Sequence, residues 1–480
     1  MSDAAVLTEC ATRVEPWLLE IPVSAHAGMR VPARVFADRQ LWDRIRSDRS
    51  LDQLVNVAML PGVERAVYAM PDVHEGYGFP VGGVAAMRPE DGVISPGGVG
   101  YDINCGVRLL VSELDRAGLG DRLEPLVHDL SRSIPSGGYA NPRLQLSSAE
   151  LRQVLQRGSA ALVERGLATT EDLACTEAGG SLTDAVPDAV SGRAVERGQD
   201  QLGTIGSGNH FVEVQVVETL YDPAAARVLG LRTGLVTVLI HTGSRGLGHQ
   251  VCTDYVRAMQ PVMARHHITL PDPQLACAPI RSPEGERYLG AMTAAANFAW
   301  ANRQAITAAV REAFTRAFGA AGDLRLVYDV AHNLAKLEQH GGQRLWVHRK
   351  GATRAFGPSH PETPERYRPV GQPVFIPGSM GTASYVLAGT DLALERSFGS
   401  ACHGAGRAMS RHAAKRVMPG HQVRRALQQM GVVVRCPSNA ELAEEAPHAY
   451  KDVDRVVDVV EAAGLARRVA RLRPVGVIKG

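Results

Sequence analysis

The chain has 480 residues, of which 45% are hydrophobic, 21% charged and 5% aromatic. These proportions are those of a globular protein, and they exclude collagen-like, mucin-like and wholly disordered chains. Fifty-two Lys and Arg residues nearly balance 50 Asp and Glu residues, so any contact with a polyanion must come from a local basic patch. Two counts stand out, 49 glycines and 16 histidines.

The chain shows no membrane or secretion signal. No apolar run approaches the ~18 residues that span a bilayer. The first 20 residues contain Asp3, Glu9, Arg13 and Glu15, where a signal peptide needs an uninterrupted apolar stretch. The seven cysteines are odd in number and widely spread, which argues against a disulfide framework. We therefore expect a cytoplasmic protein without a membrane partner.

The first predicted elements are strands that adjoin glycine-rich polar turns. Residues 107–111 form an apolar strand directly after the turn at residues 102–106. Residues 149–167 have the apolar spacing of a helix, and residues 235–240 form a strand that ends in the turn of residues 241–246. Polar side chains at strand ends are typical of a site at the edge of a sheet.

The second half of the chain repeats this pattern around a long helix. Apolar residues three or four apart predict a helix over residues 289–318. Strands at residues 324–328 and 373–376 lead into further polar turns, and another helix is predicted around residues 453–460.

No linker, low-complexity block or fixed-period repeat divides the chain. We therefore expect an α+β fold, with mixed β-sheets and surrounding helices in a single large domain over residues 1–480. Within it, residues 1–26 are an N-terminal segment of unassigned role.

Five side chains at abrupt turns are candidate metal ligands: Asp102, Cys105, His210, His241 and His332. Each histidine taken singly is better explained as a structural residue, but the set favours one or two bound ions. A thiolate with imidazoles and a carboxylate suits zinc, manganese, iron or cobalt better than magnesium or calcium, which prefer oxygen ligands.

A second constellation is the segment of residues 400–407, Ser-Ala-Cys-His-Gly-Ala-Gly-Arg, before a helix-like stretch at residues 408–417. A Gly-x-Gly turn that opens a helix offers backbone amides to a phosphate. His403 at its edge is a candidate nucleophile toward phosphorus. The alternative is that Gly404 and Gly406 simply make a tight turn.

A basic cluster lies at residues 346–354, Trp-Val-His-Arg-Lys-Gly-Ala-Thr-Arg. Such charges usually form a solvated face, but three cations and one histidine also suit a polyphosphate or an RNA backbone. We therefore take Arg349 and Lys350 from this cluster, together with Arg245, as candidate contacts to RNA phosphates.

Eight segments carry a resemblance to a known family. The segments are residues 70–84, 97–107, 206–211, 241–246, 347–352, 377–381, 402–407 and 475–480. In residues and in order they resemble the RtcB family of RNA-splicing ligases, and the resemblance extends from about Ala27 to the last residue.

The resemblance implies a GTP- and manganese-dependent RNA ligase with an RtcB-like fold. Such an enzyme joins an RNA 2′,3′-cyclic phosphate or 3′-phosphate end to a 5′-hydroxyl RNA end, through a guanylyl-histidine and an activated RNA 3′-end, in tRNA splicing or RNA repair. An archease-type activator is an implied partner. Two alternatives stay open: a paralogue that guanylates or processes 3′-ends without sealing them, and a catalytically silent RNA-binding protein.

The resemblance also implies roles for individual residues. The five candidate ligands above match the ligands of two manganese ions, and His403 matches the histidine that accepts GMP. Residues that match the guanine nucleotide site are Asn209, Phe211, Glu213, Pro377, Ser379, Ser384, His403, Ala405, Gly406, Tyr450 and Lys479. The other twelve histidines, His74 among them, are given no chemical role.

Overall fold

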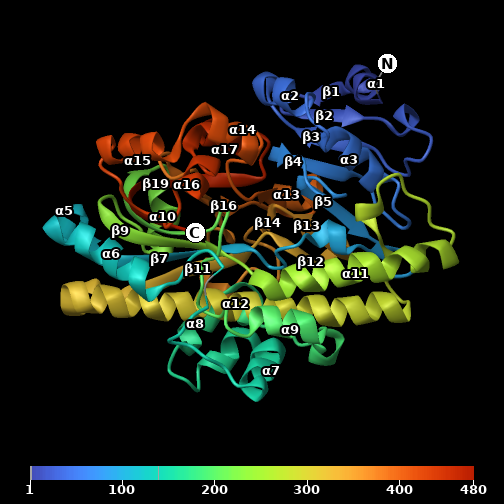
Figure 1. The fold of residues 1–480 in the computed structure, drawn as a ribbon. Helices are drawn as coiled ribbons and strands as arrows, with labels where there is room; N and C mark the ends of the chain where they lie inside the picture. Colours follow the sequence, from blue (N-terminus) through green and yellow to red (C-terminus); the bar gives the residue numbers. More distant parts are fainter. Residues whose placement is uncertain (1–2, 139) are drawn as a thin grey trace.

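The computed structural model of the protein describes residues 3–138 and 140–480. Two large mixed β-sheets lie inside one large domain, and helices surround them (Figure 1). The α+β architecture predicted from the sequence is confirmed.

The larger sheet has eight strands, in the order β11-β7-β9-β8-β19-β16-β15, with β18 beside β19. All pairs are antiparallel except β18 with β19. The strand bounds are β7 (Gly106–Asp115), β8 (Phe211–Leu220), β9 (Leu235–Thr242), β11 (Leu324–Ala331), β15 (Pro373–Ile376), β16 (Ser384–Gly389), β18 (Val433–Arg435) and β19 (Ala466–Lys479).

The second sheet has seven strands, in the order β1-β2-β3-β4-β5-β13-β12, with β3 and β4 parallel. Its first two strands come from the N-terminal segment, which therefore extends the edge of this sheet. The bounds are β1 (Thr12–Glu15), β2 (Leu18–Ile21), β3 (Ala33–Phe36), β4 (Val67–His74), β5 (Val81–Met87), β12 (Asn333–His340) and β13 (Gln343–Lys350). Two short pairs are β6 (Val93–Ile94) with β10 (Ala278–Pro279), and β14 (Ala352–Arg354) with β17 (Ser400–Cys402).

Helices of very different length cover these sheets. Their bounds are α1 (Asp3–Cys10), α2 (Arg39–Ile45), α3 (Ser50–Ala58), α4 (Pro96–Val99), α5 (Arg116–Leu119), α6 (Leu123–Ser133), α7 (Ser148–Arg157), α8 (Thr170–Ala174), α9 (Gly192–Gly198), α10 (Pro223–Leu229), α11 (Arg245–Arg265), α12 (Pro283–Phe318), α13 (Asp391–Ser397), α14 (Arg411–Val417), α15 (Gly420–Gln429), α16 (Asn439–Glu444) and α17 (Val453–Ala462). Within the described ranges, none of them combines the length and the apolar character that crossing a membrane requires.

The long helix α12 runs across the molecule with α11 alongside it (Figure 1). Ser282 caps its first turn by accepting a hydrogen bond from the amide of Gly285. Trp300 in its middle is fully buried, and Ile306 and Phe314 pack against the eight-stranded sheet with Leu110 of β7. Burial on nearly all sides explains why the apolar residues of α12 are not confined to one stripe.

Most predicted elements are confirmed, including β7, β9, β11, β15, α12 and α17. Two predictions are corrected. The helix predicted over residues 149–167 ends at Arg157, and a 3-10 turn, Gly158–Leu162, follows it. The helix predicted at residues 408–417 begins only at Arg411, after Ser410 as its N-cap.

The connection from β11 to β12 joins the two large sheets, because β11 belongs to one and β12 to the other. His332 is the single residue between these strands. Side chains from both sheets can therefore meet at His332.

Candidate active site

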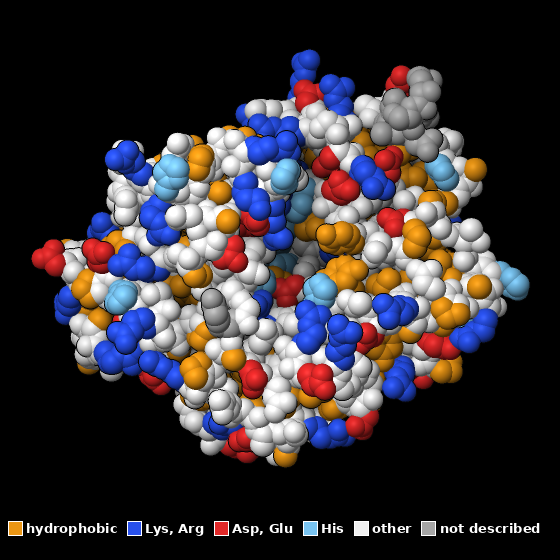
Figure 2. All heavy atoms as spheres, in the orientation of Figure 1, with side chains coloured by type: hydrophobic (Ala, Val, Ile, Leu, Met, Phe, Trp, Pro, Cys, Tyr) orange, Lys and Arg blue, Asp and Glu red, His pale blue; other side chains and the backbone are white. Residues whose placement is uncertain are grey.

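A cavity of about 890 Å³ is lined by residues of both large sheets. Figure 2 shows a hollow near the centre of one face, with histidine and acidic side chains inside it and Lys or Arg side chains on its rim. The five candidate ligands line this cavity, and so do His403 and most of the predicted nucleotide contacts.

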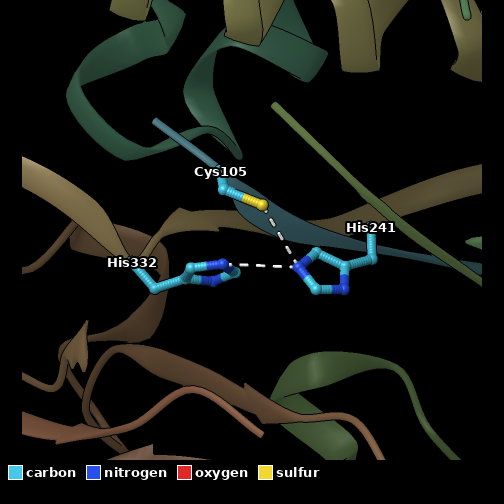
Figure 3. Close-up of side chains that lie close together, drawn as sticks. All are labelled: Cys105, His241 and His332. Carbon is cyan, nitrogen blue, oxygen red and sulfur yellow. Dashed lines mark hydrogen bonds between the residues drawn. The ribbon is translucent and has the colours of Figure 1, made fainter. Parts of the chain in front are cut away.

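The candidate ligands present their donor atoms to one another. Cys105 Sγ lies 3.3 Å from Nε2 of His210 and 3.3 Å from Nε2 of His241. Nε2 of His241 and Nε2 of His332 are also 3.3 Å apart (Figure 3). Asp102 Oδ2 lies 2.9 Å from His210 Nε2. Residues from four distant segments thus form one compact cluster.

Strand register explains this convergence. In the eight-stranded sheet, β9 lies between β7 and β8, and His241 pairs with Val107 on one side and Phe211 on the other. Cys105 and His210 immediately precede β7 and β8, so both lie at the strand end that carries His241. The pairing of strands brings together residues that are more than 100 positions apart.

Burial controls the protonation of this cluster. It raises the pKa of the Cys105 thiol and lowers those of His210, His241 and His332, so the imidazoles are neutral at pH 7. Burial alone raises the pKa of Asp102, but His210, Arg245 and Cys105 together hold the pKa of that carboxyl below its ordinary value. Neutral imidazoles and an ionised carboxylate are the forms that bind metals.

The donor set fits one or two transition-metal ions. Two groups of donor atoms each lie within 4.8 Å of one another, Cys105 with His241 and His332, and Asp102 with Cys105 and His210. Cys105 is common to both groups, so its sulfur would be a ligand in either one. Sulfur and imidazole donors favour manganese, iron, cobalt or zinc over calcium.

A buried ion pair supports the ligand cluster from behind. Arg303 on α12 donates to both carboxylate oxygens of Asp329 at 2.8 Å. The same guanidinium donates to the carbonyl oxygens of Asn104 and Thr242, which adjoin Cys105 and His241 in the chain. Both Arg303 and Asp329 are fully buried. Their hydrogen bonds link the segments that carry Cys105, His241 and His332.

His403 follows β17 and faces the cluster, with its ring centroid 4.8 Å from that of His332. Its Nδ1 lies 2.7 Å from Oδ2 of the fully buried Asp72 on β4. This contact orients the ring and leaves Nε2 as the nitrogen available for a nucleophilic role.

The Gly404–Gly406 turn does not open a helix, contrary to the sequence prediction. The amides of His403 and Gly404 donate to Asp72 Oδ2 at 3.0 and 3.2 Å, and that of Ala405 donates to the carbonyl of Pro377. Gly406 has φ +73°, and a Cβ there would lie 2.1 Å from the carbonyl oxygen of Asp72. The turn therefore fixes His403 against Asp72, and these amides are not a phosphate cradle.

A second part of the cavity has the character of a base-binding pocket. Lys479 Nζ lies 5.7 Å from the ring centroid of Phe211 and 4.0 Å from Glu445 Oε2, which accepts a hydrogen bond from the Tyr450 hydroxyl. Burial raises the pKa of Glu213 well above its ordinary value and lowers that of Lys479 to about 8. Glu213 Oε1 is buried and has no hydrogen-bond partner among the described residues.

Ten of the eleven predicted nucleotide contacts line the cavity. Ser384 instead lies behind its wall, where its hydroxyl accepts hydrogen bonds from Gln215 Nε2 and the amide of Gly378. The ten are Asn209, Phe211, Glu213, Pro377, Ser379, His403, Ala405, Gly406, Tyr450 and Lys479.

The predicted RNA contacts are separated by the structure. Arg245 lines the cavity, with its Nη1 3.2 Å from His210 Nδ1. Lys350 also lines it, but is buried and donates from Nζ to the carbonyls of Tyr77 and Phe79 at 2.8 Å.

Arg349 lies in the interior, away from the residues that line the cavity, with 4% of its surface exposed. It forms a bidentate ion pair with Glu338 at 2.7 and 2.8 Å, and Nε donates to the Ser400 hydroxyl. This arrangement contradicts a role in RNA contact, and we correct the role of Arg349 to a structural one.

Three residues of this site have no signal in sequence patterning. Asp72 orients His403, Glu445 holds Tyr450 and faces Lys479, and His74 lines the cavity 6.4 Å from His403 between ring centroids. Asp72 and His74 lie in residues 70–84, one of the segments that resemble the RtcB family. That resemblance is the signal in the sequence that points to these two residues.

Comparisons with known proteins agree with this geometry. The family model described as tRNA-splicing ligase RtcB matches residues 53–480. A protein of Archaeoglobus fulgidus named tRNA-splicing ligase RtcB is 51% identical over 475 residues, which covers 98% of each chain. A protein of Mycobacterium tuberculosis named RNA-splicing ligase RtcB is 54% identical over 435 residues, 89% of this chain and 100% of its own. The chain belongs to the tRNA-splicing ligase RtcB family.

Proposed function

We propose that this protein is a GTP- and manganese-dependent RNA ligase that joins RNA ends bearing a 2′,3′-cyclic phosphate or 3′-phosphate to 5′-hydroxyl ends. The observation that carries the proposal is the position of His403, held through Nδ1 by Asp72 and 4.8 Å from the ring of His332 in the ligand cluster. A phosphorus nucleophile beside a metal cluster suits nucleotidyl transfer.

Manganese would be held by Asp102, Cys105, His210, His241 and His332. Bound there, the metal supplies positive charge that stabilises the charge on phosphate oxygens during phosphoryl transfer.

The guanine base would lie in the pocket of Glu213, Tyr450 and Lys479. A carboxyl group can accept hydrogen bonds from the N–H groups of guanine, and an aromatic ring can stack on the base. His403 lines the same cavity, so the triphosphate of a nucleotide bound in this pocket can reach it.

His403 Nε2 then attacks the α-phosphorus of GTP, so an N–P bond forms and the bond to pyrophosphate breaks. The guanylate passes to the RNA 3′-phosphate, which converts a poor electrophile into an anhydride. The 5′-hydroxyl of the second strand attacks that anhydride, GMP leaves and a 3′,5′-phosphodiester remains. A cyclic phosphate end must first be hydrolysed to the 3′-phosphate.

The decisive experiment incubates the protein with manganese, α-labelled GTP and both RNA ends. We expect a joined product and acid-labile label on the protein, both of which are lost in His403→Ala and retained in the control His412→Ala, an exposed position. A guanylated 3′-end without joining identifies the non-sealing alternative. Label that persists on His403→Ala contradicts the nucleophile assignment.

A further inference from the structure

One part of the cavity lining is aromatic and has no role in the chemistry above. Tyr77 and Tyr101 pack edge to face with their ring centroids 5.6 Å apart, and Tyr101 lies 4.9 Å from the ring of His249. All three residues line the cavity. Tyr77 is 65% exposed, which is a high value for a tyrosine that lines a cavity.

The loop that carries Tyr77 is fastened to the protein on both sides. Gln53 donates to the carbonyl of Gly76 at 2.7 Å and accepts from its amide at 3.0 Å. Lys350 donates from its buried Nζ to the carbonyls of Tyr77 and Phe79. The backbone is therefore held in place while the Tyr77 ring projects toward solvent.

Gln274 connects this loop to Tyr101. Its side chain accepts a hydrogen bond from the Tyr101 hydroxyl at 2.9 Å. Its backbone lies against Gly78, whose φ is +72° and where an added Cβ would lie 2.5 Å from the Gln274 carbonyl carbon. Tyr101 and the loop that carries Tyr77 thus share one support, and aromatic side chains on a fixed backbone bind with less loss of conformational entropy.

The surroundings define the chemistry of the ligand. Arg197 also lines the cavity, with Nη1 3.5 Å from Nδ1 of His249. Aromatic rings beside a guanidinium suit a planar base attached to an anionic backbone. Tyr101 directly precedes the candidate ligand Asp102, so a base stacked on this surface adjoins the cluster. The guanine of GTP has its own pocket at Glu213, so this base belongs to a different molecule.

We propose that Tyr77, Tyr101 and His249 form a stacking subsite for the unpaired base at one of the RNA ends to be joined. This inference rests on the proposed function. It assigns these residues to positioning the RNA end, and Tyr77 touches no reacting atom.

The first test compares ligation by Tyr77→Ala, Tyr77→Phe and the wild type. Loss of one stacked base is expected to raise the KM for RNA about 10-fold in Tyr77→Ala with little change in kcat, and Tyr77→Phe retains the ring and the wild-type KM. Guanylation of His403 by GTP alone stays unchanged. Tyr221→Ala, which removes a tyrosine 45% exposed at the end of β8, is the matched control.

Abasic nucleotides identify the strand. One substrate lacks the terminal base on the 3′-phosphate strand, and the other lacks it on the 5′-hydroxyl strand. We expect the wild type to bind one of these abasic substrates more weakly than intact RNA, by the same factor by which Tyr77→Ala weakens the binding of intact RNA. Tyr77→Ala should bind that abasic substrate as well as it binds intact RNA. Equal abasic effects in the wild type and in Tyr77→Ala overturn the proposal, as does an unchanged KM in Tyr77→Ala.

A binding readout separates this inference from the ligase activity. RNA ends that carry 2-aminopurine as the terminal base are titrated with protein and manganese, without GTP. Stacking quenches the fluorescence in the wild type and in Tyr77→Phe but not in Tyr77→Ala. This result supports the subsite even if no joined product forms, and quenching that is equal in all three proteins rejects it even if ligation occurs.

Discussion

At the scale of single residues, the site depends on side chains that orient other side chains. Asp72 is fully buried and contacts both the imidazole and the backbone amide of His403. Arg303 acts in the same way on the ligand cluster, since it holds the carbonyls next to Cys105 and His241. The geometry of the reactive groups therefore depends on neighbours that do not themselves react.

Asp72→Asn tests this arrangement at the nucleophile. Without the carboxylate, the imidazole loses the contact that orients it, so we expect guanylation to slow by about 10²-fold or more. Asp121→Asn, at an exposed position, is the control. An unchanged guanylation rate would contradict the orienting role.

Cys105→Ser tests the shared ligand. Removal of a residue that hydrogen-bonds to a metal ligand typically lowers metal affinity by ~10–100-fold. Because Cys105 belongs to both donor groups, we expect its replacement to lower manganese affinity by more than that. Cys252→Ser is the matched control, since Cys252 is equally buried but its Sγ faces the carbonyl of Pro96. Calorimetric titration with manganese compares them, and equal losses in both variants would remove Cys105 from the ligand set.

At the scale of elements, the positions of the basic residues 349, 350 and 354 on strands β13 and β14 determine which groups these residues contact. The cluster at residues 346–354 was predicted to contact phosphate, yet most of it is buried in β13 and β14. Arg349 and Lys350 are neighbours with opposite side-chain directions, because successive residues of a strand point to opposite faces. Arg349 pairs with Glu338, and Lys350 reaches the Tyr77 loop.

The buried amine of Lys350 predicts a pH dependence of stability. Burial lowers its pKa to about 8, below the ordinary 10.5, so between these values the unfolded chain binds more protons and stability rises with pH. The wild type should therefore gain about 2 kcal/mol relative to Lys350→Met between pH 7.5 and 9.5. Urea denaturation at both pH values measures this difference, with the exposed Lys415→Met as control. A difference that is constant with pH would contradict the prediction.

At the scale of the whole molecule, two large sheets meet along one cavity. The eight-stranded sheet brings Cys105, His210 and His241, and the seven-stranded sheet brings Asp72 and Lys350. The cavity also collects the local positive charge that a net charge of +2 does not provide. Its arginines are Arg197, Arg245, Arg407 and Arg411.

This distribution predicts a shallow salt dependence of RNA binding. With at most these four arginines on phosphates, the slope of log K against log salt for single-stranded RNA should be no steeper than about −3. Arg245→Gln should reduce it by about 0.7. Fluorescence anisotropy across a potassium chloride series measures both. A slope steeper than about −5 would reveal a basic RNA surface outside the cavity.

Much of the secondary structure could be read from the sequence. The strands at residues 235–240 and 373–376 and the long helix at residues 289–318 are found where apolar patterning predicts them. Predictions failed where local pattern competes with tertiary contacts. Residues 158–162 leave the helix for a 3-10 turn, and the amides of residues 403–405 are used inside the protein.

The sequence by itself determined the types of reactive group and the family, because a motif such as residues 402–407 can be recognised from its residues and their order alone. Only the tertiary structure decided which groups act together. Asp72 is 331 residues from His403 in the chain, and Arg349 looks the same in sequence whether it faces RNA or Glu338. The physical reason is that charge and proton affinity depend on burial and on neighbours, and these are set by strand pairing between distant segments.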